Sequence, residues 1–487
     1  MTVTDRGAVR GSAIDGVTNW KGIPFAAPPV GPLRFSAPKP HACWRGVRDA
    51  SDFGAPCPQV DGGIQIGSED CLTLNVWTPT KRAAPRPVMV FVHGGGHLNG
   101  SAANEVAGVT LYDGTDVART GDVVVVTVQY RIGALGWLAD PALEPEGAAG
   151  NYGLLDQIAA LKWVQRNIAG FGGDPKRVLL FGESAGAVDT CLLVSSPTAR
   201  GLFSRALIQS GACRADDRAA AERNAASFTQ AAGCAGAPAA AADCLRALPV
   251  SRVLVTNPGS VDLTSIGRPR YGPYVDGRVI PEDPLTRIEA GRANRVPMVV
   301  GSNADETAIF VRNVQTPEDY YAALQGIVGA AGAARIVAEY PVDRYPNARA
   351  AMIAATSDAF FTCGAGRIVR AAVAGQGKPV YRYIFTHTME GGTLRSLGAF
   401  HGLELFFVFG HLATTGYTPT PAEAALSTAM IGYWSRFAET GDPNGKGAVV
   451  WPEATAGADG YLDLNVTIAA GDGVRTAQCV FWDSLIP

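Results

Sequence analysis

The chain has 487 residues, of which 47% are hydrophobic and 17% are charged, so it can bury a large core and is not a disordered protein. Its net charge is −3, so it lacks the excess of positive charge that is typical of proteins that bind polyanions, and we expect no nucleic-acid partner. The longest apolar stretch, residues 123–128, has the length of a strand and not the roughly 20 residues of a membrane helix, so we expect no membrane span.

A glycine-rich turn follows the first strongly apolar segment. Residues 87–92 predict a buried strand, and His93, three glycines and His97 follow at once. A nucleotide-binding loop is one alternative, but such a loop opens a helix, whereas the residues after His97 predict a loop. A shared metal is another, but three glycines disfavour a helix that would put both imidazoles on one face. The turn therefore predicts bare backbone N–H donors for a negatively charged oxygen.

The most informative motif follows a later apolar run. Residues 178–181 predict a strand, residues 182–186 read Gly-Glu-Ser-Ala-Gly, and a helix-compatible segment follows. A sharp strand-to-helix turn exposes a serine where a base and an ester carbonyl can both reach it. We therefore predict Ser184 as a nucleophile. The expected oxyanion-hole donors are the N–H groups of Gly95, Gly96 and Ala185.

The order of the predicted elements indicates the fold class. Strand-like runs alternate with helical ones such as residues 158–165, which is the pattern of a mostly parallel sheet flanked by helices. With the strand-turn-helix motif at Ser184, this pattern predicts the α/β-hydrolase fold. The motifs extend from one end of the chain to the other, so we expect a single domain over residues 1–487. Residues 215–283, which include an alanine-rich run, are the expected cap or insertion.

A carboxylate should follow Ser184 at the end of a later strand, where it can orient the base. Residues 297–304 predict that strand, and Asp305 and Glu306 lie side by side directly after it. Neighbouring side chains usually point apart, so one of the two acids is expected to take the role. The spacing of the residues does not choose between them.

The base should be a histidine that follows both Ser184 and the acid. Three histidines meet this condition: His387, His401 and His411. His401 stands in a turn that leads into an apolar segment, which favours it. The other two remain alternatives on local chemistry alone.

Taken together, these segments resemble the type-B carboxylesterase family, the cholinesterase-like branch of the α/β-hydrolases. The resemblance covers almost the whole chain and implies a serine carboxylic-ester hydrolase that works through an acyl-enzyme, with a small ester as its partner and with no metal or cofactor. One departure is Thr307, where the family usually has glycine, and it bears on the shape of the local loop. The matching segments are residues 20–31, 33–35, 68–76, 151–157, 171–175 and 437–444.

The resemblance also assigns roles residue by residue. It makes Ser184 the nucleophile, Glu306 the acid and His401 the base. It places Glu183 and Ser210 as a pair that borders the histidine, and it gives the oxyanion role to the same three donors, Gly95, Gly96 and Ala185.

Nine cysteines are many for a cytosolic hydrolase, and their placement resembles the family's disulfide framework. The unassigned cysteines Cys43, Cys191 and Cys213 are odd in number, so at least one should be a free thiol or form an intermolecular bond. The pairs that the resemblance implies are Cys57 with Cys71, Cys234 with Cys244, and Cys363 with Cys479.

The cysteines favour an exported protein, secreted or periplasmic, because disulfides persist in oxidising compartments. Residues 1–6 contain no apolar signal segment, so we expect a signal peptide that is absent from this chain. The alternative is a cytoplasmic protein with reduced cysteines.

Substrate scope follows from the loop between Cys57 and Cys71. Relatives that bind choline place a tryptophan there, and lipase-like relatives carry a long apolar lid. Residues 58–70 contain no aromatic residue, so we expect an open gorge that admits bulky aryl or alkyl esters. A non-catalytic cholinesterase-like binding or adhesion module is the alternative. Such modules typically lose the nucleophile, which this chain retains.

Overall fold

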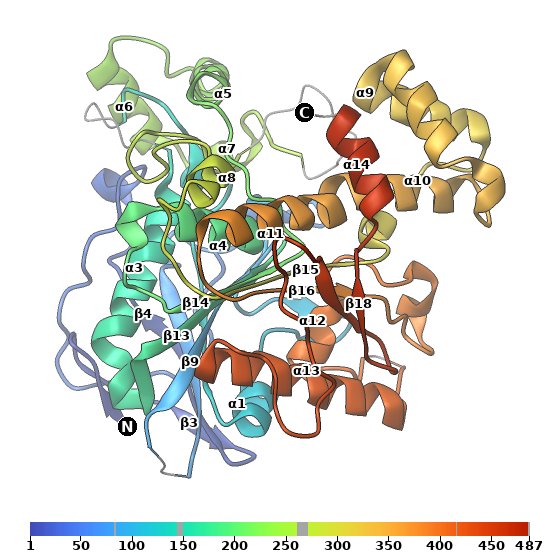
Figure 1. Ribbon diagram of the computed structural model, residues 1–487. Coiled ribbons are helices and arrows are strands. Elements are labelled where there is room, and N and C mark those ends of the chain that lie inside the picture. Colours follow the sequence, from blue (N-terminus) through green and yellow to red (C-terminus); the bar gives the residue numbers. More distant parts are fainter. Residues whose placement is uncertain (82–83, 144–149, 261–270, 415, 486–487) are drawn as a thin grey trace.

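An eleven-stranded mixed sheet runs through the computed structural model, which describes residues 1–81, 84–143, 150–260, 271–414 and 416–485 (Figure 1). The strands lie in the order β18-β17-β16-β15-β14-β13-β9-β12-β8-β4-β3. All neighbours from β12 to β17 run parallel, and antiparallel pairs form both edges. The strands are β3 Ser12–Ile14, β4 Val17–Pro24, β8 Thr73–Pro79, β9 Arg86–Val92, β12 Val124–Val128, β13 Gly173–Glu183, β14 Arg205–Gln209, β15 Met298–Asn303, β16 Val380–Phe385, β17 Gly460–Leu464 and β18 Ala469–Asp472.

Helices cover both faces of this sheet, because successive side chains of a buried strand point to opposite faces. In β9, Val88 and Val90 join the core beneath α3, α4, α8 and α11, whereas Met89 and Phe91 join the core beneath α1, α12 and α13. The helices are α1 Thr115–Gly121, α2 Gly133–Trp137, α3 Tyr152–Asn167, α4 Ala185–Ser195, α5 Arg218–Ala231, α6 Pro238–Ala247, α7 Val250–Val255, α8 Pro284–Glu289, α9 Pro317–Glu339, α10 Ala348–Ser357, α11 Cys363–Gly375, α12 Leu403–Val408, α13 Pro421–Thr440 and α14 Thr476–Leu485.

Short elements complete the described structure. The smaller sheets pair β1 (Thr2–Val3), β2 (Ala8–Arg10) and β5 (Val47–Asp49); β6 (Gln59–Asp61) and β7 (Ile64–Ile66); and β10 (Glu105–Val106) and β11 (Val109–Thr110). The single helical turns are η1 Gly31–Leu33, η2 Ile168–Phe171, η3 Pro197–Ala199, η4 Glu306–Ile309, η5 Val342–Arg344, η6 Asp358–Thr362 and η7 Thr393–Leu397.

The sequence sets the ends of the long helix α13. Thr420 caps its first turn by accepting the N–H of Glu423, and Glu423 returns a bond to the Thr420 N–H, which together form a capping box. Pro421 follows as the first helical residue, where its missing N–H costs nothing. At the other end Gly441 adopts a left-handed conformation and stops the helix.

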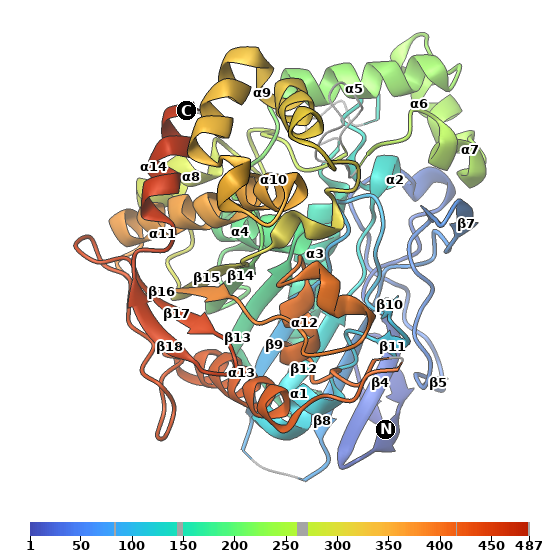
Figure 2. The ribbon, with the colours of Figure 1, turned by 90° about the vertical axis from the view of Figure 1, so that its right-hand side faces the viewer.

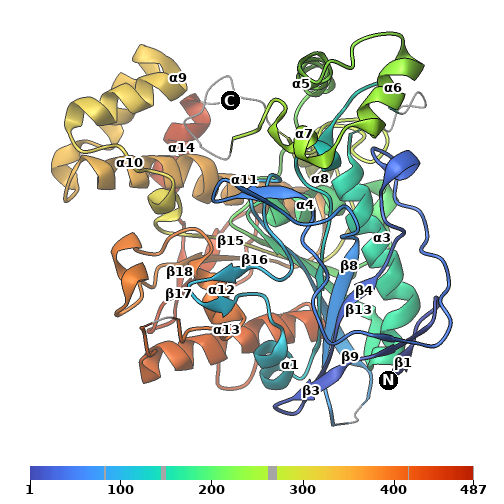
Figure 3. The same ribbon diagram turned by 180° about the vertical axis from the view of Figure 1, so that it is seen from behind.

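Two groups of helices lie at the same end of the molecule, beyond the sheet. Helices α5, α6 and α7 lie on one side, and α9 and α10 lie on the other with α14 beside them (Figures 2 and 3). The first group falls within residues 215–283, the segment expected to form a cap. Residues 261–270 of that segment lie outside the described residues.

One run of described residues, Pro317–Arg344, is long and apolar enough to cross a membrane by length and composition alone. Gly329, inside α9, has φ +75° and ψ 170°, so two helical pieces meet there at a kink. The run is therefore not one continuous helix.

Four disulfides connect the described residues. Three are the pairs that the resemblance implied: Cys57–Cys71, Cys234–Cys244 and Cys363–Cys479. The fourth joins Cys191 to Cys213, which the sequence left unassigned. Cys43 is exposed and unpaired, so the odd cysteine is a free thiol.

Candidate active site

Ser184 sits at the junction between β13 and α4, where the chain turns sharply. Its backbone has φ +57° and ψ −121°, a conformation that side-chain-bearing residues rarely adopt, and its N–H donates to the Gln209 carbonyl at 2.9 Å. Strain of this kind persists only where the surrounding structure enforces it, and it is often found at functional sites. The predicted elbow is present in this geometry.

Two glycines allow the elbow to pack closely against the end of β9. A Cβ on Gly186 would lie 2.0 Å from the Val92 carbonyl oxygen, and a Cβ on Gly94 would lie 2.8 Å from the Cβ of Ser184. Contacts this short are not tolerated, so only glycine fits at either position. The glycine-rich turn after β9 is thereby brought directly against the serine.

His401 lies between two buried glutamates. Its Nδ1 is 2.6 Å from Glu306 Oε2, and its Nε2 is 3.1 Å from Glu183 Oε1. The Nδ1 contact has hydrogen-bond geometry, whereas the Nε2 contact is an ion-pair distance without that alignment. Of the two acids that the residues alone left open, Glu306 is the one that contacts the histidine.

Asp305 has a different task. Its carboxylate accepts the N–H of Ala399 at 3.0 Å, and its own N–H donates to the Ala399 carbonyl at 3.0 Å. The His401 N–H donates to the Glu306 carbonyl at 3.3 Å. Both adjacent acids thus hold the turn that carries the imidazole. Asp305 binds Ala399 through its backbone and its side chain, whereas Glu306 binds His401 mainly through its side chain.

A buried polar network supports Glu306 from behind. Glu306 Oε1 accepts the Asn303 N–H at 2.7 Å, and the Asn303 amide donates to Glu404 at 2.5 Å. Glu404 also accepts from the Gln209 amide at 3.1 Å. Glu404 is not among the residues predicted from the sequence, although it stands three residues after His401 at the start of α12, where a carboxylate close to the imidazole could have been suspected.

The clustered acids change the proton affinities of the site. Burial works against a charged imidazole, but the carboxylates of Glu183 and Glu306 outweigh it and raise the pKa of His401 to about 9. Burial raises the pKa of Glu183 to about 8, although His401 acts in the opposite direction. Burial and the charge of Glu306 raise the pKa of Glu404 to about 7. The carboxylates therefore favour the protonated imidazole of His401, and burial favours the protonated carboxyl of Glu183.

Ser184 and His401 line one cavity, but no hydrogen bond joins the Ser184 hydroxyl to the imidazole among the described contacts. Catalytic hydrogen bonds are often long in ligand-free structures and tighten when substrate binds. Ser210 also lines this cavity, and its buried Oγ has no hydrogen-bond partner among the described residues. Glu183 and Ser210 therefore both line the cavity that His401 lines.

The three residues of the predicted oxyanion hole line the same cavity as Ser184. Gly95 and Gly96 line the cavity, and within the described chain neither N–H donates a hydrogen bond. Ala185 also lines the cavity and is the first residue of α4. The N–H groups in the first turn of a helix have no acceptor within that helix, and the Ala185 N–H is one of them. Unpartnered donors at a helix start are suited to an anionic oxygen.

The cavity has a volume of about 840 Å³, within the range of small-molecule sites. Its walls are largely apolar, and the rings of Phe361 and Phe310 lie 4.9 and 5.5 Å from the His401 ring. No described residue of the 58–70 loop lines it. Its other apolar lining residues include Val188, Tyr271, Ile309, Phe360, Leu394, Leu397, Phe400, Leu405 and Trp482.

Four other histidines have structural partners. His387 contacts Glu423 at 3.2 Å, and His411 contacts the Asp113 carbonyl at 2.9 Å. His93 stacks on Tyr130, and burial lowers its pKa to about 4. His97 lines the cavity and contacts the buried Asp189 at 2.9 Å. Neither alternative base, His387 nor His411, lines the cavity.

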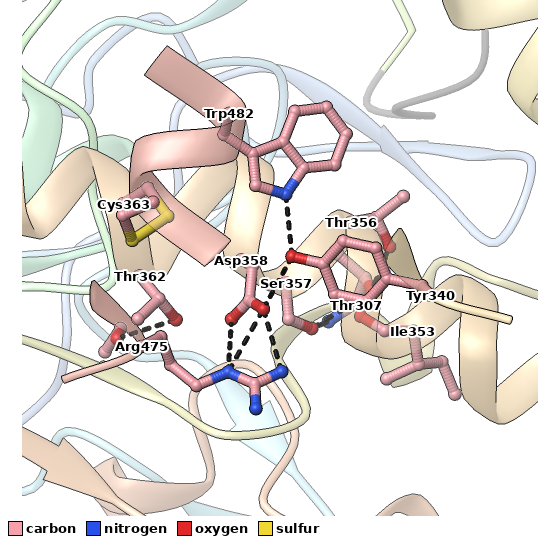
Figure 4. Close-up of polar contacts among 12 residues, drawn as sticks. Thr307, Tyr340, Ile353, Thr356, Ser357, Asp358, Thr362, Cys363, Arg475 and Trp482 are labelled. Atoms are coloured by element: carbon pink, nitrogen blue, oxygen red, sulfur yellow. Dashed lines mark hydrogen bonds and ion pairs between the residues drawn. A yellow bond between two sulfur atoms is a disulfide. The ribbon is translucent and has the colours of Figure 1, made fainter. Parts of the chain in front are cut away.

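Thr307, the departure from the family pattern, fixes the loop after the acid to α10. Its N–H donates to Ser357 Oγ at 3.1 Å, and its hydroxyl lies 2.6 Å from that of Thr356 (Figure 4). A glycine could make only the first of these contacts. The threonine therefore adds a side-chain tether between η4, which begins at Glu306, and α10.

A serine at a strained strand-to-helix turn, on a central parallel sheet and near a histidine paired with an acid, defines an α/β-hydrolase. The model of the carboxylesterase family matches residues 1–482. A solved structure of PNB esterase superposes with a TM-score of 0.85, at 35% identity and with 99% of each chain covered. The predicted fold class is confirmed.

Curated relatives agree. The chain is 35% identical to para-nitrobenzyl esterase of Bacillus subtilis, covering 93% of this chain and 92% of the relative. It is 35% identical to a medium-chain fatty acyl-CoA hydrolase precursor of Anas platyrhynchos, with 99% and 92% covered. It is 33% identical to pyrethroid hydrolase Ces2e of Rattus norvegicus, with 99% and 89% covered.

The chain belongs to the carboxylesterase family. It is an enzyme that hydrolyses carboxylic esters, as the sequence predicted, and the non-catalytic binding module is not favoured.

Proposed function

We propose that Ser184, His401 and Glu306 hydrolyse neutral carboxylic esters through an acyl-enzyme. The observation that carries this proposal is the 2.6 Å contact between Glu306 and His401 Nδ1, which leaves Nε2 without a hydrogen-bond partner among the described residues, in a cavity that Ser184 also lines. His401 takes the serine proton as the hydroxyl attacks, and Glu306 stabilises the imidazolium. His401 then gives the proton to the leaving alcohol oxygen, and water removes the acyl group by the reverse steps.

The negative oxygen of the tetrahedral intermediate binds the N–H groups of Gly95, Gly96 and Ala185. Each such donor typically contributes about 3–4 kcal/mol to the transition state, so the turn after β9 matters nearly as much as the triad. Glu183 and Ser210 border the imidazole, and Glu183 raises its pKa without reacting.

The proposed substrates are bulky aryl or alkyl esters. The large, mainly apolar cavity supports this class, as does the absence of residues 58–70 from its described walls. The name of the para-nitrobenzyl esterase relative points to aryl-containing esters, and that of the pyrethroid hydrolase relative to larger ester substrates. A preference for choline esters over neutral aryl esters, or a rate jump at the micelle threshold, would contradict this proposal.

The proposed setting is outside the cytoplasm, supported by the four disulfides. We further infer that the chain forms a single domain in which residues 215–283 serve as a cap. Helices α5, α6 and α7 of that segment, and the cavity-lining residues Asp216 and Tyr271, support this inference.

Labelling with diethyl p-nitrophenyl phosphate tests the assignment of the nucleophile. The reagent phosphorylates an activated serine, so peptide mapping should find the adduct on Ser184 with parallel loss of phenyl acetate hydrolysis. The variant Ser196→Ala is a matched control, because Ser196 is a buried serine at the C-terminal end of α4 and is absent from the cavity lining. An adduct on another residue, or full activity in labelled protein, would contradict the assignment.

A further inference from the structure

The turn that follows β9 is held in an unusual backbone conformation. Gly95, Gly96 and His97 have φ angles of +105°, +61° and +59°, so three successive residues have positive φ. Glycine adopts such angles at little cost, whereas a residue with a side chain does so only where its surroundings enforce it. The contacts of His97 therefore decide where the neighbouring N–H groups of Gly95 and Gly96 lie.

Three contacts enforce this conformation on His97. Its carbonyl accepts the N–H of Gly133 at 2.6 Å, and its ring packs edge-on against that of Trp137, with 4.8 Å between the ring centroids. Its Nε2 lies 2.9 Å from Oδ1 of Asp189, with hydrogen-bond geometry. Nε2 is the donor of this bond, because a carboxylate only accepts hydrogen bonds.

Asp189 belongs to the helix that begins at the elbow. It stands in the second turn of α4, which follows Ser184, and its side chain is fully buried. Its other oxygen, Oδ2, accepts the side-chain amide of Gln157, in α3, at 2.5 Å. No lysine or arginine of the described chain pairs with this carboxylate, so His97 and Gln157 are the groups that satisfy it. A buried carboxylate is costly without such partners, which favours keeping the contact with His97.

The bond between Asp189 and His97 joins two parts of the site that must act together. His97 directly follows the proposed oxyanion donors, and Asp189 lies on the helix whose start forms the elbow. His97 lines the cavity, whereas Asp189 is absent from its described walls. A donor is effective at about 2.7–3.1 Å from the oxyanion, and a misplacement of about 1 Å can cost about 10²-fold in rate. The bond therefore helps to fix the donors relative to Ser184.

We propose that Asp189 and His97 are positioning residues that hold the backbone donors of the turn after β9 in place for the oxyanion. These donors are the N–H groups of Gly95 and Gly96. Asp189 acts through His97, and His97 acts through the backbone that it shares with the two glycines. The proposal rests on the function proposed above, because it needs these N–H groups to bind the oxyanion.

Two ketone inhibitors separate stabilisation of an oxyanion from ordinary binding. With phenethyl trifluoromethyl ketone, the Ser184 oxygen bonds to the carbonyl carbon, the serine proton passes to His401, and the carbonyl oxygen becomes an anion that needs the backbone donors. Such an adduct resembles the tetrahedral transition state and binds tightly for that reason. Phenethyl methyl ketone has nearly the same shape, but its carbonyl is too unreactive for this addition, so it binds without forming the anion.

We expect Asp189→Ala and His97→Phe each to lower kcat/KM for phenyl acetate by about 10- to 100-fold, which is less than the loss of one whole donor. Each should weaken inhibition by the trifluoromethyl ketone by a similar factor and leave inhibition by the methyl ketone unchanged. Asp189→Asn keeps an oxygen that accepts from Nε2, so it should retain most of the activity. His97→Phe keeps a ring beside Trp137 and carries the test if Asp189→Ala does not fold.

A double-mutant cycle tests whether Asp189 acts through His97. In a His97→Phe background, Asp189→Ala should change the inhibition constant of the trifluoromethyl ketone by less than about twofold. His387→Phe is the matched control, because His387 is also a buried histidine in contact with a buried carboxylate, that of Glu423, and neither residue lines the cavity. Its two inhibition constants should stay at the wild-type values.

Three results would overturn the proposal: unchanged activity in both Asp189→Ala and His97→Phe, equal weakening of the two ketones, or fully multiplicative effects in the cycle. Equal weakening would show a general distortion of the cavity. Labelling by diethyl p-nitrophenyl phosphate distinguishes this failure from failure of the proposed function. If the function fails, the label misses Ser184 in the wild type, which then binds both ketones equally. If only the positioning proposal fails, the wild type is labelled on Ser184 and prefers the trifluoromethyl ketone.

Discussion

At the scale of single residues, the site is organised around one imidazole and an excess of negative charge. Glu306 contacts Nδ1, Glu183 lies 3.1 Å from Nε2, and Glu404 is connected to Glu306 through Asn303. A base must be neutral to accept the serine proton, whereas all of these acids favour the charged imidazole. The proton affinity of His401 is therefore controlled by its neighbours.

Glu183→Gln tests this control. The substitution removes a negative charge beside Nε2, which lowers the pKa of His401, so the imidazole becomes neutral at lower pH. The acid limb of the kcat/KM profile should move to lower pH by about one unit or more, the range expected for a charge at this distance. The profile is measured with phenyl acetate, because kcat/KM reports the groups of the free enzyme.

Glu423→Gln serves as its control. Glu423 is also buried beside a histidine, His387, but neither residue lines the cavity. Its profile should match that of the wild type. An acid limb in Glu183→Gln that stays in place or moves to higher pH would refute the electrostatic account.

At the scale of elements, the elbow depends on close packing between the start of α4 and the end of β9. Gly186→Ala would force a Cβ to within 2.0 Å of the Val92 carbonyl oxygen. We expect a loss of about 1–3 kcal/mol in the free energy of unfolding, as for other overpacked sites, together with loss of activity. Urea denaturation measures the first and hydrolysis of phenyl acetate the second.

Gly326→Ala is the matched substitution in a helix. A Cβ there meets nothing within 4 Å, and the residue lies in α9. Replacing an unstrained glycine should raise stability by about 0.4–1 kcal/mol through the unfolded chain. Equal effects of the two substitutions would show that the elbow is not tightly packed.

Local sequence patterns were enough to predict the elbow, but they were not enough to predict which distant residues contact it. Ser184 was found because its strand, turn and helix are contiguous in the sequence. The sequence alone did not decide whether Asp305 or Glu306 is the acid of the triad. The two differ only in their contacts with a distant turn, where Asp305 binds Ala399 and Glu306 binds His401. The imidazole was likewise one of three candidates until the family resemblance singled out His401.

Other features had no local signal. Cys191 lies in α4 and Cys213 follows β14, and they meet because β14 runs parallel beside β13. The turn η6, which carries Phe361, contacts residues far along the chain, because Asp358 pairs with Arg475 and the adjoining Cys363 is bonded to Cys479. The fold class itself was predictable, because the alternation of strands and helices is regular and the motifs keep their order.

At the scale of the whole molecule, the parallel strands bring distant segments to one edge of the sheet. The turn after β9, the elbow after β13 and the acid after β15 all follow strands that run in the same direction. Ligands of open α/β sheets bind at the carboxyl ends of their strands. Segments beyond the sheet complete the cavity: Asp216 precedes α5, Tyr271 follows α7, and Trp482 belongs to α14.

The number of reactive thiols tests the disulfide framework of the entire chain. Four disulfides and an exposed Cys43 predict one reactive thiol in denaturant before reduction and nine afterwards. Mass spectrometry of alkylated protein gives both numbers. Nine reactive thiols before reduction would contradict the disulfide framework and remove the support for an exported protein.

The proposed reaction depends on Ser184 being the nucleophile that His401 activates. Ser184→Ala tests it most directly, because the side chain shrinks by one oxygen and the fold should be unaffected. We predict that kcat for phenyl acetate falls by about 10⁶-fold, as for other triad knockouts, with an unchanged unfolding midpoint. Turnover near the wild-type value in a folded Ser184→Ala protein would contradict the account.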